Sequence, residues 1–298
     1  MTDSFEDRDL EVRGLKLRVR IGGPASGAPI LLVHGWMDTG RSFDRLVPFL
    51  HAAGYKTHAL DLRGHGDSSW VQPGGFYHFV DYLGDIDGAL DALDLPGPIR
   101  FIGHSMGGAL GMIYAAARPG RISRAALLDG MPLLIKASEI PERLTAYLDD
   151  LKTIRRVRRT VQSLAHAAER LRKVSPALQE DAALLLAEAG VSPDPKQENK
   201  LAWKWDPWLR AHSPIPLTEA AFAELLPLIQ AEILILRADH TWLPEPAELK
   251  ERLGRLTAPL AVHSVAGTSH HLHIEKAGEV ATRIVEAWRT RAQVAGGF

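Results

Sequence analysis

The chain has 298 residues, 46% of them hydrophobic, which suits one large α/β domain with an insertion and a substantial core. Its formal net charge of -1 gives no electrostatic reason to expect a nucleic-acid partner. It has no cysteine, which excludes disulfides, thiolate metal sites and a cysteine nucleophile, and which fits a reducing compartment.

The N-terminal residues are acidic and lack the basic and apolar regions of a secretory signal. No stretch of the sequence approaches the length of a membrane span. We therefore expect a soluble, cytoplasmic protein that acts on a small molecule, and the sequence leaves a homodimer open.

The first part of the chain reads as strands that lead into polar turns. Residues 10–21 alternate apolar and charged side chains, which indicates a hairpin, and the apolar run 30–33 indicates a buried parallel strand that ends at His34. The next strand, 56–60, leads into Asp61-Leu-Arg-Gly-His-Gly-Asp-Ser68. For His34, and for His65 and Asp67 within that turn, we prefer a structural role over a catalytic one.

A Gly-x-Ser-x-Gly pentad, Gly103 to Gly107, lies between a strand-like run and a run of helical periodicity. Ser105 therefore sits on a sharp turn whose glycines leave room for neighbouring elements. The amide of Met106, at the start of the expected helix, points to where an oxyanion would form. This pattern fits a serine nucleophile, but such a pentad also recurs by chance at an ordinary glycine-rich start of a helix.

The chain pattern changes after a buried strand that ends just before Asp129. Residues 131–217 contain no buried strand-like runs, and their apolar residues recur at helical spacing. The chain therefore divides into a core, 1–130, an inserted helical segment, 131–217, and a second core segment, 218–298. Four arginines between positions 155 and 159 are expected on the solvated face of a helix.

The last part of the chain supplies two strands and two polar turns. The strand 231–237 leads into a turn whose one carboxylate is Asp239, and the strand 260–265 leads into a turn that contains His270, His271 and His273. Their spacing suggests a metal site, but we expect none, because further acidic and histidine ligands are missing nearby in the sequence. We expect no cofactor either.

Taken together, four motifs resemble the α/β-hydrolase superfamily in its capped, lipase- or epoxide-hydrolase-like branch. They are His34-Gly35-Trp36, the turn 61–68, the pentad at Ser105, and Gly267-Thr-Ser-His270-His-Leu-His-Ile-Glu275. The resemblance implies a mostly parallel eight-stranded sheet flanked by helices, with a mainly helical cap inserted after the sixth strand.

The resemblance also implies roles for these residues. The base of a Ser-His-Asp triad falls on His270, with His271 as the alternative, and the second oxyanion amide falls on Trp36. The acid is expected on Asp239, although its turn is one residue shorter than the commonest pattern; Asp129 is the alternative. The order serine, acid, histidine is that of α/β hydrolases.

We therefore predict a serine hydrolase that cleaves a carboxylic ester, thioester or lactone of a small to medium apolar substrate. The alternatives are cofactor-free perhydrolase or haloperoxidase-like activity and a non-catalytic ligand receptor on the same fold. The aromatic and apolar residues expected to line the substrate site are Trp36, Met37, Trp203, Trp205, Trp208 and Trp242.

Overall fold

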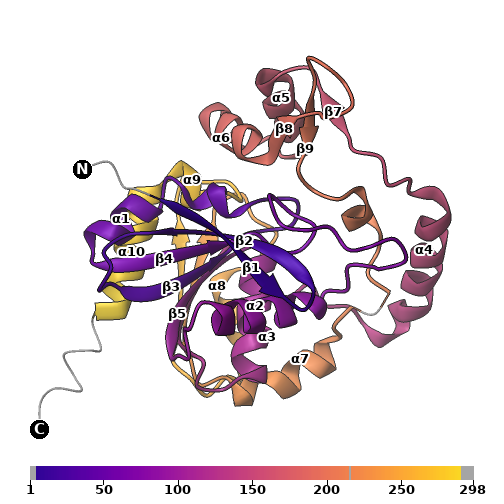
Figure 1. The fold of residues 1–298 in the computed structure, drawn as a ribbon. Coiled ribbons are helices and arrows are strands. Elements are labelled where there is room, and N and C mark those ends of the chain that lie inside the picture. Colours follow the sequence, from indigo (N-terminus) through magenta and orange to yellow (C-terminus); the bar gives the residue numbers. More distant parts are fainter. Residues whose placement is uncertain (1–4, 215, 290–298) are drawn as a thin grey trace, which may run out of the picture.

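The computed structural model describes residues 5–214 and 216–289, which form an eight-stranded sheet carrying an inserted segment (Figure 1). The strand order is β1-β2-β4-β3-β5-β6-β10-β11. Antiparallel pairing joins β1 to β2 and β2 to β4, and every other pair is parallel, as expected from the sequence. The strands are β1 (Glu6–Val12), β2 (Leu15–Gly22), β3 (Ala28–Val33), β4 (Tyr55–Leu60), β5 (Ile99–His104), β6 (Ile122–Leu128), β10 (Glu232–Ala238) and β11 (Leu260–Val265).

Helices cover both faces of this sheet. One face packs against α2 (Asp81–Ala92), α3 (Met106–Ala117), α7 (Glu219–Leu225), the 3₁₀ turn η4 (Leu226–Leu228) and α8 (Pro246–Arg252). The other face packs against α1 (Val47–Ala52) and α10 (Ala277–Arg289). Two short elements, η1 (Gly40–Phe43) and α9 (Leu272–Glu275), lie in the turns near the site described below.

The continuous apolar runs of the central strands explain this two-sided covering. Successive side chains of a strand point to opposite faces. Thus Leu31 and Val33 of β3 join the core under α2 and α3, whereas Ile30 and Leu32 join the core under α1 and α10. All four side chains are fully buried, so the run forms a central strand of the sheet.

The inserted segment lies between β6 and β10. Its helices are α4 (Ile140–Thr153), α5 (Leu164–Val174) and α6 (Glu180–Gly190), with the 3₁₀ turns η2 (Ala137–Glu139) and η3 (Pro207–Arg210). It also contains an antiparallel three-stranded sheet that sequence analysis missed: β7 (Thr160–Val161), β9 (Leu201–Trp203) and β8 (Val191–Pro193). Its strands have only two or three residues, too few to show a period of two. Figure 1 shows α4 apart from the unit formed by α5, α6 and these strands.

The predicted helix for the four arginines is wrong, whereas the predicted solvent exposure holds for Arg155, Arg158 and Arg159. Helix α4 ends at Thr153, and the arginines lie in the non-helical connection to β7. Arg156 is not solvated like a helix face, since its Nε donates to the buried carboxylate of Asp206 at 2.8 Å. Within the described ranges, no helix is both long and apolar enough to cross a membrane.

Candidate active site

Ser105 occupies the sharp turn between β5 and α3. Its backbone has φ 50° and ψ -115°, a strained conformation for a residue with a side chain. A Cβ at Gly103 would lie 2.3 Å from the Gly107 carbonyl oxygen, and one at Gly107 would lie 2.0 Å from that of Val33. The pentad therefore needs glycine at both flanking positions, because the strand, the turn and the helix approach each other too closely for any side chain.

His270 contacts Ser105 across the carboxyl end of the sheet. Its Nε2 lies 2.9 Å from the Ser105 Oγ, and its Nδ1 lies 2.7 Å from the Oδ2 of Asp129. A carboxylate only accepts hydrogen bonds, so Nδ1 carries the proton and Nε2 presents a lone pair to the serine hydroxyl. This tautomer lets His270 take the proton of Ser105.

Asp129 follows β6 directly and is fully buried. Besides His270, its carboxylate accepts hydrogen bonds at Oδ1 from the Ala238 amide at 3.0 Å and from the Thr241 hydroxyl at 2.6 Å. These donors fix the carboxylate and stabilise its charge inside the protein. Sequence analysis did not single out Thr241; its position three residues after β10, beside a candidate acid, was the one available signal.

We expected Asp239 to be the acid partner of His270, but in the structure Asp239 does not contact the imidazole. Asp239 is exposed, and its Oδ2 accepts a hydrogen bond from the amide of Gly267. The short turn after β10 brings it to the loop that precedes His270 rather than to the imidazole. Asp129 takes the place beside the imidazole, because β6 and β10 are paired neighbours and both end at this edge.

The loop after β3 reaches Ser105 through Gly35. A Cβ at Gly35 would lie 3.2 Å from the Ser105 Cβ, so this backbone borders the serine. The next residue, Trp36, is 52% exposed, and its indole Nε1 donates to the Leu209 carbonyl oxygen in η3 at 3.0 Å. Met37 has a positive φ of 58°, and its side chain packs on the core. Met106 is the first residue of α3.

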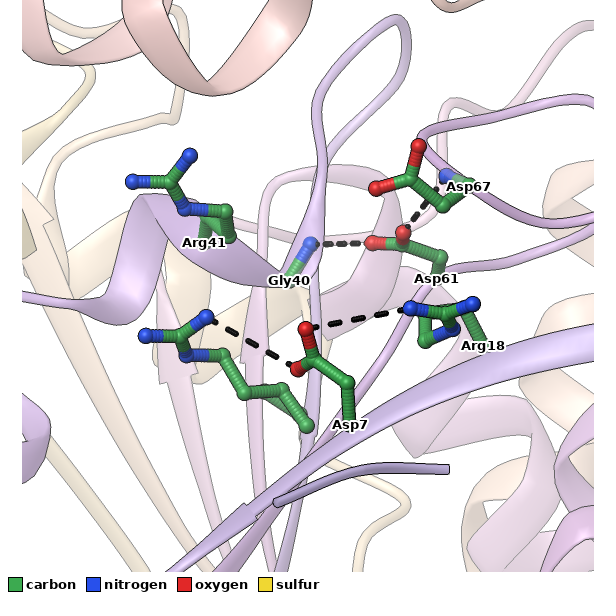
Figure 2. Close-up of a pocket in the computed structure, with 8 residues that line it drawn as sticks. Asp7, Arg18, Gly40, Arg41, Asp61 and Asp67 are labelled. Carbon is green, nitrogen blue, oxygen red and sulfur yellow. Dashed lines mark hydrogen bonds and ion pairs between the residues drawn. The ribbon is translucent and has the colours of Figure 1, made fainter. Parts of the chain in front are cut away.

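Asp61 ties this loop to the turn 61–68, and Figure 2 shows its carboxylate between the two backbone segments. It accepts hydrogen bonds from the amides of Gly40, at 2.6 Å, and Asp67, at 2.8 Å. Burial raises the pKa of Asp61 to about 6, an effect that these amides oppose. Asp67 itself forms an ion pair at 2.9 Å with Lys204, in the inserted segment.

His34 and His65 are buried side by side beneath the same loop. The Nδ1 of His34 donates to the Gly35 carbonyl oxygen at 2.6 Å, while its Nε2 accepts from the Leu62 amide at 3.1 Å. His65 donates from Nδ1 to the Arg63 carbonyl oxygen at 2.9 Å. Burial lowers the pKa of His34 to about 4. These contacts order the loops, in line with the structural role preferred for both residues.

Known proteins match most of this chain. Residues 28–277 match the family model of the alpha/beta hydrolase fold. The chain belongs to the α/β hydrolase family. Serine hydrolase-like protein 2 of Homo sapiens is 28% identical over 241 residues, which cover 77% of this chain and 74% of that protein. Serine hydrolase-like protein of Danio rerio is 32% identical, but the match covers 59% of this chain and 55% of that protein.

Solved structures resemble this hydrolase along nearly its full length. A hypothetical protein from Pseudomonas aeruginosa PAO1 has a TM-score of 0.84 at 29% identity, covering 96% of this chain and 100% of the other. A thioesterase domain from the curacin biosynthetic pathway has a TM-score of 0.80 at 28% identity, covering 95% and 99%. The fold inferred from four short motifs is thereby confirmed.

The tryptophans expected at the substrate site of this hydrolase differ in how deeply they are buried. Trp203 is only 6% exposed and packs with Trp205 in the core of α5, α6 and the small sheet, which argues against its expected substrate contact. Trp208 lies against Phe76, with ring centroids 6.1 Å apart. Trp242 is 43% exposed. The dense aromatic patch 203–208 thus builds part of the interior of the inserted segment, and Trp242 lies outside that segment.

Of the other histidines in the 266–275 turn, His271 is half-buried and His273 is buried. His270, not His271, contacts Ser105. His273 is fully buried, with its ring 4.3 Å from that of His104 and 5.1 Å from that of Phe43. Neither ring nitrogen of His273 has a hydrogen-bond partner among the described residues, so this side chain supports the turn by packing.

Proposed function

We propose that the protein is a serine hydrolase that cleaves a carboxylic ester, thioester or lactone through an acyl-enzyme. The observation that carries the proposal is the hydrogen-bonded series Ser105 Oγ, His270 Nε2, His270 Nδ1 and Asp129 Oδ2, with separations of 2.9 and 2.7 Å. A serine hydroxyl is a weak nucleophile, and a base in direct contact is what activates it. Asp129 replaces Asp239 as the proposed acid.

The proposed reaction has two steps. Ser105 Oγ bonds to the substrate carbonyl carbon while His270 takes the hydroxyl proton; the bond to the alcohol or thiol then breaks as His270 returns the proton to that group. Water repeats the sequence on the acyl-enzyme and releases the acid. Asp129 holds the proton-accepting tautomer throughout and stabilises the imidazolium.

The amides of Met106 and Trp36 would stabilise the oxyanion formed in both steps. Met106 begins α3, where the amides of the first turn have no partner within the helix. Trp36 follows Gly35, whose backbone borders Ser105. Removing one such donor typically costs a factor on the order of 10² to 10³ in rate.

We propose that residues 131–217 form a cap and that the substrate is apolar and of small to medium size. Helix α4 buries none of its side chains and leaves Leu144 and Leu148 at least two-fifths exposed. It reaches the core through Tyr147, which packs edge-on against Phe76 with ring centroids 4.9 Å apart. Such exposed apolar surface, on the helix that contacts Phe76 and through it Trp208, suits an acyl chain or ring.

Hydrolysis of p-nitrophenyl esters from acetate to decanoate tests the proposal, with Ser105→Ala as the blank. We expect turnover that disappears in Ser105→Ala and in His270→Ala, with the chain-length optimum reporting the size of the acyl site. Acyl-thioesters assayed by thiol release extend the series, a choice supported by the thioesterase neighbour. The proposal fails if a fluorophosphonate does not label Ser105 and no substrate in either series is cleaved above the blank.

Perhydrolysis is a second candidate. The non-heme chloroperoxidase of Streptomyces lividans is 36% identical over 124 residues, which cover 41% of this chain and 44% of that protein. In this reaction hydrogen peroxide replaces water in attack on the acyl-enzyme and releases a peracid. Peracid formation from acetate and peroxide, compared with ester hydrolysis by the same preparation, distinguishes the two.

A further inference from the structure

Three polar side chains meet behind the triad, each from a different segment of the chain: His104 ends β5, and Asp38 and His271 lie in turns. Asp38 follows Trp36 and Met37, His104 precedes Ser105, and His271 follows His270. One ligand atom of each, a carboxylate oxygen of Asp38 and a ring nitrogen of each histidine, lies within 4.8 Å of the other two. The sequence pattern argues against a metal because the flanking acidic and histidine ligands of such motifs are missing nearby in the sequence, but the fold brings Asp38 and His104 to His271.

The protonation of His104 follows from its hydrogen bond. Its Nε2 lies 2.9 Å from the carbonyl oxygen of His270, which can only accept, so Nε2 carries the proton. A neutral imidazole that carries its proton on Nε2 leaves Nδ1 as an acceptor. Its Nδ1 therefore presents a lone pair.

That lone pair faces another acceptor. The Nδ1 of His104 lies 3.9 Å from the Oδ2 of Asp38, and the two side chains are 2% and 9% exposed. Neither atom, nor the buried Nδ1 of His271, has a hydrogen-bond partner among the described residues. The other carboxylate oxygen of Asp38 accepts from the Thr39 amide at 2.7 Å. A buried carboxyl oxygen and a ring nitrogen that face each other without a donor between them need either a proton or a metal ion between them.

We propose that Asp38, His104 and His271 form a binding site for a divalent transition-metal ion such as Zn²⁺. Two imidazoles and one carboxylate are a donor set for such ions, whereas Ca²⁺ and Mg²⁺ prefer oxygen ligands alone. A ligating histidine typically donates its other ring nitrogen to a carbonyl or carboxylate, and His104 does this toward His270.

The geometry requires a small adjustment. Ligand bonds of about 2.0 to 2.1 Å place the donor atoms of a tetrahedral ion roughly 3.4 Å apart. The three side chains therefore close by up to about 1.4 Å when they coordinate, a movement within the range of ring and carboxylate rotation. The bound ion would connect the loop of Trp36, the serine turn and the loop of His270, so it would hold these loops together whatever the substrate is.

The first experiment is isothermal titration of tag-free, EDTA-treated protein with Zn²⁺, repeated with Asp38→Asn and His271→Gln. We expect one saturable site per chain that weakens about ten-fold or more in each variant. His212→Gln is the matched control. It removes an exposed histidine whose Nδ1 pairs with Asp150 at 2.7 Å, and the titration should not change.

A second readout uses stability. Zn²⁺ that binds the folded state should raise the melting temperature of the parent protein and of His212→Gln, but much less that of the two ligand variants. Absence of a saturable site in the parent protein overturns the proposal, as does Zn²⁺ binding to Asp38→Asn and His271→Gln with the same affinity as to the parent protein. If Asp38→Asn does not fold, as judged by circular dichroism, His271→Gln alone decides.

Discussion

The Nδ1 of His270 and the Oδ2 of Asp129 lie 2.7 Å apart although 141 residues separate them in the chain. The sheet brings them together. β6 delivers Asp129, and the turn after β11 delivers His270, with β10 paired between these two strands. The order of the strands in the sheet therefore determines which acid contacts His270. The distance between motifs along the sequence does not determine it.

The first prediction compares the two candidate acids. Asp129→Asn should lower kcat for ester hydrolysis by a factor on the order of 10⁴, because an amide no longer fixes the proton-accepting tautomer of His270. Asp239→Asn should change kcat by no more than a few-fold, since its carboxylate accepts from the Gly267 amide and does not contact the imidazole. Steady-state rates of both variants on one p-nitrophenyl ester check this. A larger loss in Asp239→Asn would reverse the assignment.

Asp129 and Asp239 also show how much of the candidate site the sequence predicts. The pentad predicts the position of Ser105, because glycine spacing and the change from strand to helix are local signals. The short turn after β10 is a local sign against Asp239 as the acid, but the side to which Asp239 points has no local signature. Both candidate carboxylates follow buried strands, so the sequence narrows the choice to two residues.

Thr241 carries the second prediction, as a positioning residue for Asp129. Its hydroxyl donates to the Asp129 Oδ1 at 2.6 Å. A hydrogen bond to a charged group contributes about 1.5 to 3 kcal/mol, so Thr241→Val should lower kcat about ten-fold or more with little change in KM. Thr241→Ser keeps the donor and should recover most of the rate. Equal losses in both variants would mean that packing, rather than the hydrogen bond, matters at this position.

The third prediction concerns stability at acid pH. Burial lowers the pKa of His58, in β4, to about 4, from an ordinary value of 6.5. Between these values the unfolded chain binds the proton and the folded chain does not, so the stability that His58 contributes falls as the pH drops from about 6.5 to about 4. The slope is up to about 1.4 kcal/mol per pH unit for one group.

The matching variant is His58→Gln, which keeps a polar side chain but cannot titrate. Other buried groups act in both proteins: the lowered pKa of His34 adds to the acid sensitivity, and the raised pKa of Asp61 opposes it. The difference between the two proteins therefore isolates His58. Urea unfolding at pH 7, 6 and 5 should show a smaller loss of stability in the variant. Parallel losses would refute the prediction.

The inserted segment shows where sequence patterns fail for a different reason. Helical spacing continues past Thr153 in the sequence, yet the chain leaves the helix there and Arg156 turns toward Asp206. Asp206 is fully buried at the start of η3. This contact joins residues 50 positions apart, and no periodicity reports it. The spacing of apolar residues reports the buried face of a single helix. It does not report a contact such as that of Arg156 with the buried Asp206.

Asp206 carries the last prediction. Its carboxylate accepts hydrogen bonds from the Tyr77 hydroxyl at 2.7 Å, from Arg156 Nε at 2.8 Å and from the Trp208 amide at 3.1 Å. Asp206→Asn removes the charge that these donors surround, and it should lower the free energy of unfolding by about 3 kcal/mol or more. Asp150→Asn is the control, because its partner His212 is exposed and such pairs contribute at most about 1 kcal/mol. Urea unfolding of both variants measures the difference, and equal losses would show that the Asp206 contacts do not stabilise the fold beyond a surface pair.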